Sequence, residues 1–99
     1  MKLRYSRRAT RDLDAIQEYL VDRNPRGAVN VMTAIFASVE FIRRHPEAAP
    51  AVSNIAGVRS VVVHRYRFKV FYRVLASDEV VEIVHIRHTS RRPWSGETD

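Results

Sequence analysis

The spacing of the hydrophobic residues changes once along the chain, and this change constrains the fold more than any other feature. Before Pro46 the apolar residues recur three or four positions apart, as on one face of an amphipathic helix. After Gly57 there are three runs rich in Val, Ile, Tyr and Phe, which is typical of strands. The chain is therefore expected to be an α+β protein, with a helical first half and a sheet formed by its second half.

Two helices are predicted to meet at Asn24-Pro25. The first should begin after Ser6, which is the predicted N-cap, and should end before Pro25 because a residue that precedes Pro avoids the α conformation. Asn24 can then cap the second helix, with Pro25 at its first position. The apolar face of the first helix consists of Ala9, Leu13, Ile16 and Leu20, and that of the second of Ala28, Met32, Ile35, Val39 and Ile42.

Three further apolar residues of the second helix, Val29, Val31 and Phe36, are predicted to lie off its main stripe. The second helix is therefore apolar over more than one face. Either it lies deep in the core, or part of its surface is left for a partner.

Strands are expected over residues 58–63, 66–75 and 79–88, preceded by a short opening strand near residues 2–6. The short connections predict an antiparallel meander. A three-residue loop over 76–78 pairs Leu75 with Glu79, and the same register places Val70 opposite Val84 and Lys69 opposite His85. One face of the sheet would then be apolar and pack on the helices.

The other face would carry a cluster of cations. In the predicted register its members are Arg67, Lys69, Arg73, His85 and Arg87. The formal net charge is +6, and all but two of the 17 basic residues are Arg. Such a surface attracts nucleic acid or an acidic protein, and Arg suits contacts to phosphate or carboxylate. The alternatives are that the cluster is simply solvated and that the Arg excess reflects codon usage.

The last strand runs into IVHIRHTSRRPW, residues 83–94, which adds basic residues and the only Trp. Residues 88–94 are expected to leave the sheet as a cationic, aromatic terminus that contacts a target, because Trp and Arg are enriched at binding hot spots. The candidate target-binding residues are His88, Arg91, Arg92 and Trp94. In the alternative interpretation, Trp94 folds back over an edge of the core.

The composition excludes several classes of chemistry. The chain has no Cys, and His85 and His88 are three apart, so on a strand they point to opposite faces and no metal site is expected. No glycine-rich phosphate loop is present, and no cofactor is expected. One enzymatic option is metal-independent RNA cleavage by His85 or His88 together with nearby cations. The catalytic candidates are then His88, or His85 in its place, with Arg67, Lys69, Arg87 and Arg91.

The chain contains no apolar run near the roughly 20 residues that a membrane span needs and no signal-peptide pattern. A single cytoplasmic domain over residues 1–99 is expected, without a membrane partner.

The order of the elements and several of their residues resemble the RelE/ParE superfamily of toxins from type II toxin–antitoxin systems. SRRATRDLDAIQEYL, residues 6–20, looks like the opening helix of the family, and residues 24–46, ending in His45-Pro46, look like its second helix. GVRSVVV, FKVFYRV and EIVHIRH look like its closing strands. The resemblance covers nearly the whole chain and implies a strand, a helical hairpin and an antiparallel meander.

The superfamily divides by target. RelE-like members cleave messenger RNA in the ribosomal A site, and ParE-like members poison DNA gyrase. The two second-strand Lys positions of the RelE-like pattern fall at Ser60 and Val62, its third-strand Arg falls at Lys69, and its Arg after the last strand falls at about Thr89. The basic, aromatic ending after His88 resembles the ParE-like branch.

The resemblance therefore implies a ParE-like toxin that poisons DNA gyrase without being an enzyme. It also implies a ParD/RelB-like antitoxin, which we expect to bind at Val29, Val31 and Phe36 in a hetero-oligomeric complex. Two alternatives stay open: a ribosome-dependent endoribonuclease, and a non-toxic partner that helps its antitoxin bind operator DNA.

Overall fold

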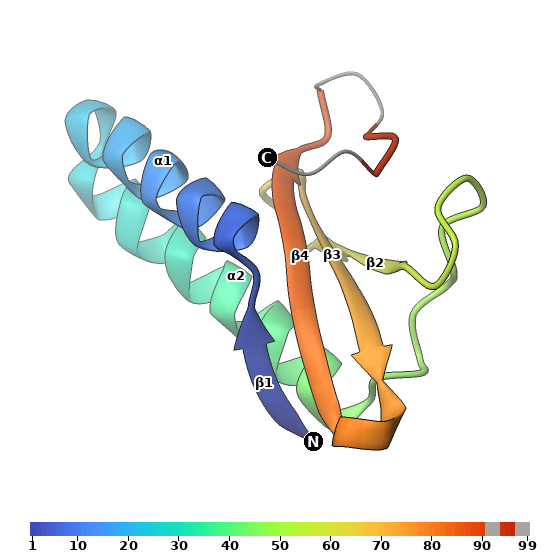
Figure 1. Cartoon of the computed structure of the whole chain (residues 1–99). Helices are drawn as coiled ribbons and strands as arrows, with labels where there is room; N and C mark the ends of the chain where they lie inside the picture. The colour runs from blue at the N-terminus through green and yellow to red at the C-terminus, as the bar shows by residue number, and fades with distance from the viewer. Residues whose placement is uncertain (91–93, 97–99) are drawn as a thin grey trace.

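A computed structural model describes residues 1–90 and 94–96, and it places two helices on one face of a four-stranded sheet (Figure 1). The predicted α+β class, with its strand, helical hairpin and meander, is confirmed. No helix in these residues is both long and apolar enough to cross a bilayer. The elements are β1 (Lys2–Tyr5), α1 (Arg7–Arg23), α2 (Pro25–Arg44), β2 (Arg59–Val63), β3 (Phe68–Leu75), a 3₁₀ turn (Ala76–Asp78) and β4 (Val80–His88).

Both predicted helix caps are present. The Ser6 hydroxyl accepts a hydrogen bond from the Ala9 N–H at 3.0 Å, and it also donates to the Val84 carbonyl at 3.1 Å, which ties the start of α1 to β4. The Asn24 side chain accepts from the Gly27 N–H at 3.0 Å, and Pro25 opens α2 as predicted. These caps satisfy backbone donors that a helix N-terminus leaves unpaired.

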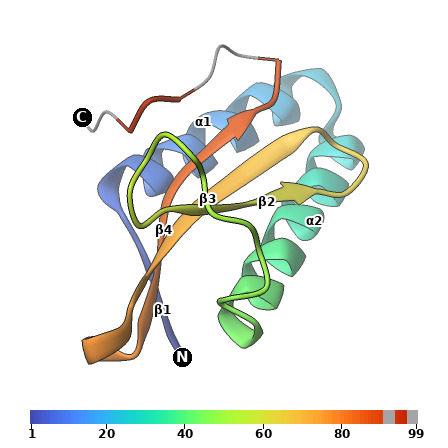
Figure 2. The same ribbon diagram turned by 90° about the vertical axis from the view of Figure 1, so that its right-hand side faces the viewer.

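The sheet has the strand order β1-β4-β3-β2. Strands β2, β3 and β4 form the predicted antiparallel meander. β1 pairs with β4 in the parallel direction, which the sequence did not predict. Figure 2 shows the helices behind the sheet and the segment after α2 crossing in front of it, so the two faces of the sheet are covered by different parts of the chain.

The predicted register between β3 and β4 is wrong. Glu79 adopts the left-handed conformation, with φ 54°, and belongs to the turn, so Leu75 pairs with Val80. A bulge at Phe71/Tyr72 then inserts Val84 as an extra residue of β4. The register therefore differs from the prediction by one position near the turn and by two positions beyond the bulge.

The main core lies between the helices and the sheet. Its largest fully buried side chains are Tyr72, Ile35, Ile42, Ile83, Ile86, Val63, Val70 and Val81. Val31 is 7% exposed and belongs to this core, so its predicted place off the main stripe is wrong. Val31 lies three positions after Ala28 and four before Ile35, which puts all three on one side of α2.

Tyr72 fastens the segment after α2 to the sheet. Its side chain is 0% exposed, and its hydroxyl donates to the Pro46 carbonyl at 2.7 Å. Burial raises the pKa of the Tyr72 phenol above its usual range, against the opposing influence of Arg59.

We expect Tyr72→Phe to lower the free energy of unfolding by about 1 kcal/mol, because the Pro46 carbonyl loses its donor. The raised pKa also predicts an alkaline loss of stability. Below a pH of about 10 both states keep the phenol proton, and above it the unfolded chain ionises first, so stability falls as the pH rises. Urea unfolding between pH 7 and 11 measures both effects. Tyr19→Phe, at a side chain that is 57% exposed, is the control and should change neither value.

Candidate functional site on the outer face of the sheet

The outer face of the sheet, which points away from the helices, carries a second apolar cluster. Val58, Phe71 and Trp94 are buried there, with Val52, Ile55 and Val84 partly buried against them. The predicted cationic face is therefore only partly correct, because its centre is apolar. The two faces of the sheet each bury hydrophobic residues, as in a layered domain.

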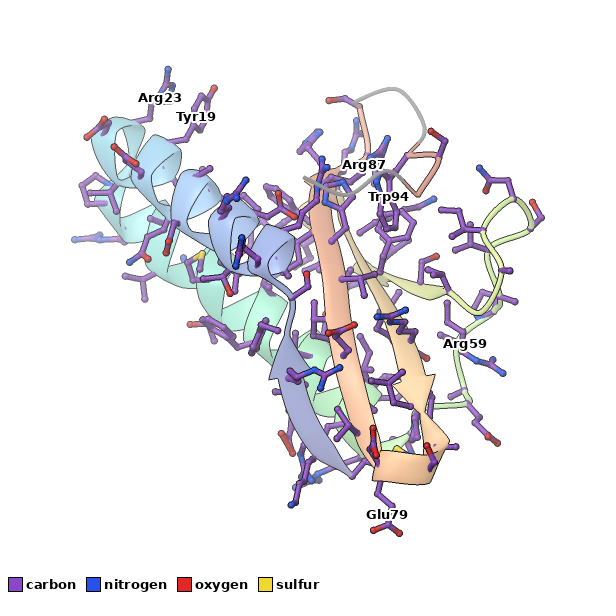
Figure 3. All side chains as sticks on the ribbon, viewed as in Figure 1. Tyr19, Arg23, Arg59, Glu79, Arg87 and Trp94 are labelled. Atoms are coloured by element: carbon purple, nitrogen blue, oxygen red, sulfur yellow. The ribbon has the colours of Figure 1, made fainter. Side chains whose placement is uncertain are left out.

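Trp94 folds back onto this face. Its side chain is 7% exposed, and its ring centroid lies 5.0 Å from that of Phe71 and 4.7 Å from that of His85. The Asn54 side-chain amide donates to the Trp94 carbonyl at 3.5 Å. Figure 3 shows Trp94 beside the end of β4 that also carries Arg87. The prediction of a terminus that leaves the sheet is wrong at His88, which pairs with Phe68 as the last residue of β4, and at Trp94. For Trp94 the alternative interpretation, a residue that folds back over the core, is confirmed.

His85 lies under Trp94 and is anchored by α1. It is 5% exposed and stacks on Phe71 at a centroid distance of 5.7 Å. Its Nδ1 lies 2.7 Å from Asp12 Oδ2 and 3.2 Å from Arg8 Nε. Since a carboxylate can only accept, the shorter contact assigns the Nδ1 proton to a bond with Asp12, with the Arg8 cation alongside.

Asp12 has a second partner in the backbone of β4. The same Oδ2 accepts from the Ile86 N–H at 2.9 Å, next to the bulge. The pairing of β1 with β4 ends at Ile83. Beyond that point, the Asp12 carboxylate accepts the backbone hydrogen bond that a longer β1 would otherwise take. This role of Asp12 could not be predicted from the sequence, because no spacing rule connects Asp12 with His85, 73 residues later.

The predicted cations occupy different environments. Lys69 and Arg87 face each other across β3 and β4. Arg73 donates to Glu82 Oε1 at 2.8 Å, and Arg4 donates to Glu82 Oε2 at 3.1 Å, so this carboxylate neutralises part of the cluster. Arg67 lies in the turn before β3, with φ 57°.

His88 is turned toward the helix side of the sheet. Its ring meets that of Phe68 edge-on at 5.3 Å, and Phe68 packs on the main core. The Ser90 N–H donates to His88 Nδ1 at 3.1 Å, and the Ser90 hydroxyl lies 2.6 Å from the same atom. Neighbouring strand residues alternate between faces, so Lys69 and Arg87 project to the outer face. The described nuclease candidates are thus divided between the two faces.

The remaining positions singled out in the sequence fall into two groups. Arg91 and Arg92 lie outside the described residues. Ser60 and Val62 pair with Phe71 and Lys69, and therefore lie on the outer face without adding a cation. Within residues 1–90 and 94–96, no group of three His, Asp or Glu side chains is placed to hold a metal ion.

A cleft of about 330 Å³ opens beside the Trp94 cluster, between the start of α1 and the outer face. Its polar walls include Arg7, Arg8, Arg73 and Glu82, and its apolar surface includes Val84 and Trp94. Both charged and apolar groups thus meet in one depression on this side of the molecule.

A second, shallower groove of about 600 Å³ runs between α2 and the β2–β3 turn. Ala34, Ala37 and Phe41 line its helix side, and Val61 and Tyr66 line its sheet side. On α2, the predicted partner residues Val29 and Phe36 are 65% and 47% exposed. Two of the three residues proposed for antitoxin binding are therefore accessible, while Val31 is not.

Comparison with known proteins gives consistent matches. The family model described as the ParE toxin of the type II toxin–antitoxin system parDE matches residues 3–93. Comparison with curated protein sequences gives no match. A chromosomal ParDE toxin–antitoxin structure from P. aeruginosa is similar with a TM-score of 0.79 and 27% identity, over 91% of this chain and 97% of that one.

More distant structures share the fold. The YoeB/ParE toxin from Agrobacterium tumefaciens has a TM-score of 0.62 and 22% identity, over 89% of this chain and 98% of that one. The E. coli RelBE toxin–antitoxin complex has a TM-score of 0.61 and 12% identity, over 91% of this chain and 98% of the matched chain.

Proposed function

This chain belongs to the family of ParE toxins of type II toxin–antitoxin systems, and from that premise we propose that it arrests bacterial growth by binding and poisoning DNA gyrase. In this proposal the toxin is not an enzyme. It stabilises gyrase complexes in which the DNA is cleaved, and replication stops as a result. An antitoxin neutralises it in a hetero-oligomeric complex in the cytoplasm.

One observation carries the choice of a non-enzymatic mechanism. RNA cleavage needs an acid, a base and cations gathered around one phosphate. On the outer face, Trp94 and Phe71 enclose His85, whose Nδ1 is bound to Asp12. His88 lies with Phe68 on the other side of the sheet from Lys69 and Arg87. This division among the described residues favours a binding protein over a nuclease.

Substitution of His88 distinguishes a gyrase-binding toxin from an endoribonuclease. We expect His88→Ala to retain toxicity, because a gyrase-binding protein needs no acid or base at this position. The measurement is growth after induction of each variant, with soluble protein quantified by immunoblot and folding checked by circular dichroism. A folded His88→Ala protein that no longer arrests growth would favour the endoribonuclease instead. Ser90→Ala, which removes a hydroxyl next to the His88 ring, is the companion control.

We propose that the antitoxin covers the exposed apolar side of α2. Val29 and Phe36 lie seven positions apart and thus on one side of the helix, as an amphipathic partner segment requires. The groove between α2 and the β2–β3 turn, which includes Ala37 and Phe41, offers further apolar surface on another side of the same helix. The net charge of +6 would attract an acidic segment and raise its association rate.

We expect Phe36→Asp to weaken antitoxin binding at least tenfold, since a carboxylate would replace an apolar contact. Calorimetry with the antitoxin encoded beside this chain measures the change. Tyr19→Asp, at another exposed aromatic residue of the hairpin, is the matched control. Equal losses in the two variants, or none in Phe36→Asp, would contradict this docking surface.

A further inference from the structure

The cleft beside Trp94 combines positive charge with an apolar floor. Within residues 1–90 and 94–96, three guanidinium groups, those of Arg7, Arg8 and Arg73, line it together with one carboxylate, Glu82. The two oxygens of that carboxylate already accept from Arg73 and from Arg4, which lies outside the cleft. Among the described residues that line the cleft, cations therefore outnumber carboxylates.

Arg7 is the cation best placed to meet a ligand. It is exposed at the lip of the cleft, and within the described part of the chain its guanidinium makes no ion pair or side-chain hydrogen bond. Arg73 is half-exposed, and its bond to Glu82 uses only Nε. Guanidinium groups of this kind suit bidentate contacts to an incoming carboxylate.

The apolar part of the cleft is formed by Val84, Val58, Ile55 and Trp94. Ile55 and Trp94 come from the segment that crosses the outer face and from the C-terminal part of the chain, respectively. Gly96 follows at φ 94°, where an added Cβ would lie 3.3 Å from the Ile55 side chain. The C-terminal residues 94–96 thus form one wall of the cleft rather than lying apart from it.

We propose that this cleft binds an acidic peptide segment that carries a bulky apolar side chain. Acidic side chains would bind Arg7 and Arg73, and the apolar side chain would lie against Val84 and Trp94. Glu82 and the apolar floor oppose a polyphosphate backbone, whose binding depends on a continuous row of cations. This site is separate from the α2 surface assigned to the antitoxin, and it does not depend on gyrase being the target.

The single Trp provides a direct measurement, because Trp94 is part of the wall. The purified protein is titrated with acetyl-Glu-Asp-Leu-Phe-Glu-Asp-amide while Trp94 emission is followed, and calorimetry is run in parallel. We expect saturable binding with a shift in emission. The neutral peptide acetyl-Gln-Asn-Leu-Phe-Gln-Asn-amide should bind about tenfold more weakly or worse, as should acetyl-Glu-Asp-Gly-Ser-Glu-Asp-amide, which lacks the apolar residues.

Three Arg-to-Gln variants test whether the peptide binds in this cleft. Arg7→Gln and Arg73→Gln should each lower the affinity for the acidic peptide by about five- to tenfold. Arg26→Gln removes the same charge at the far end of the helical hairpin, one 17-residue helix away from Arg7, and should leave affinity within about twofold. Equal losses in all three variants would mean non-specific attraction and would overturn the proposal. So would the absence of heat and of an emission change, or binding of inorganic phosphate as tight as that of the peptide.

Discussion

Replacing Trp94 with Ala should lower the free energy of unfolding by about 3 kcal/mol, because it empties the centre of the outer-face cluster. The side chain is 7% exposed and packs on the Phe71 and His85 rings. A domain of this size has a free energy of unfolding of about 5–15 kcal/mol, so the loss would be a large share of the total. Urea unfolding followed by circular dichroism measures it without depending on the indole.

Trp94→Phe is the matched control for this variant. It keeps an aromatic ring against Phe71 and His85 and should recover more than half of the lost stability. If Trp94→Ala unfolds at the same urea concentration as the wild type, residues 94–96 do not contribute to the core, and the described outer-face cluster is contradicted.

Asp12→Ala is expected to lower the free energy of unfolding by about 2–4 kcal/mol, although the substitution lies on a surface helix. Asp12 Oδ2 accepts from the buried Ile86 N–H at 2.9 Å and binds His85 Nδ1 at 2.7 Å. Removing it leaves two buried polar groups without that partner, each at a cost of about 1–3 kcal/mol. Chemical denaturation at pH 7 measures the loss.

Asp14→Ala is the control for Asp12→Ala. It removes the same charge from α1 two residues later, where the side chain is exposed, and should change stability by less than about 0.5 kcal/mol. Amide hydrogen exchange gives a second measurement, because the Ile86 N–H should lose protection in the Asp12 variant alone. Equal protection of Ile86 in both variants would mean that Asp12 does not hold the edge of β4.

Local signals in the sequence were enough to predict the helices. The Asn24-Pro25 pair marks the end of one helix and the start of the next, because a residue before Pro avoids the α conformation. The spacing of Ala28, Ile35 and Ile42 shows the buried side of α2. Val31 was predicted to lie on a second face because Met32, its neighbour in the chain, was taken as part of the buried stripe. Val31 is in fact the more buried of the two residues. The rule itself, a spacing of three or four residues, places Val31 with Ala28 and Ile35.

The sheet register could not be predicted in the same way. It depends on Glu79 adopting a left-handed conformation, which is uncommon for a residue of this type, and on the bulge that adds Val84 to β4. Neither feature can be recognised from the types of residue present. Together they move His85 from its predicted partner Lys69 to a position opposite Phe71.

The candidate site depends on contacts between residues far apart in the chain. The pair of Asp12 and His85 joins residues 73 positions apart, and the parallel pairing of β1 with β4 brings Arg4 to Glu82. The sequence did allow the return of Trp94 to the sheet as one of two interpretations. It could not decide between them, because Trp is typical both of cores and of binding surfaces.

The most direct test of the central claim is a gyrase assay with the purified protein. DNA gyrase, ATP and relaxed plasmid are incubated with increasing amounts of the toxin, and the products are resolved with and without protein denaturation. The proposed mechanism predicts loss of supercoiling and the accumulation of cleaved plasmid, both reversed when the antitoxin is added. Supercoiling and cleavage that stay unchanged at a high molar excess of the folded protein would contradict it.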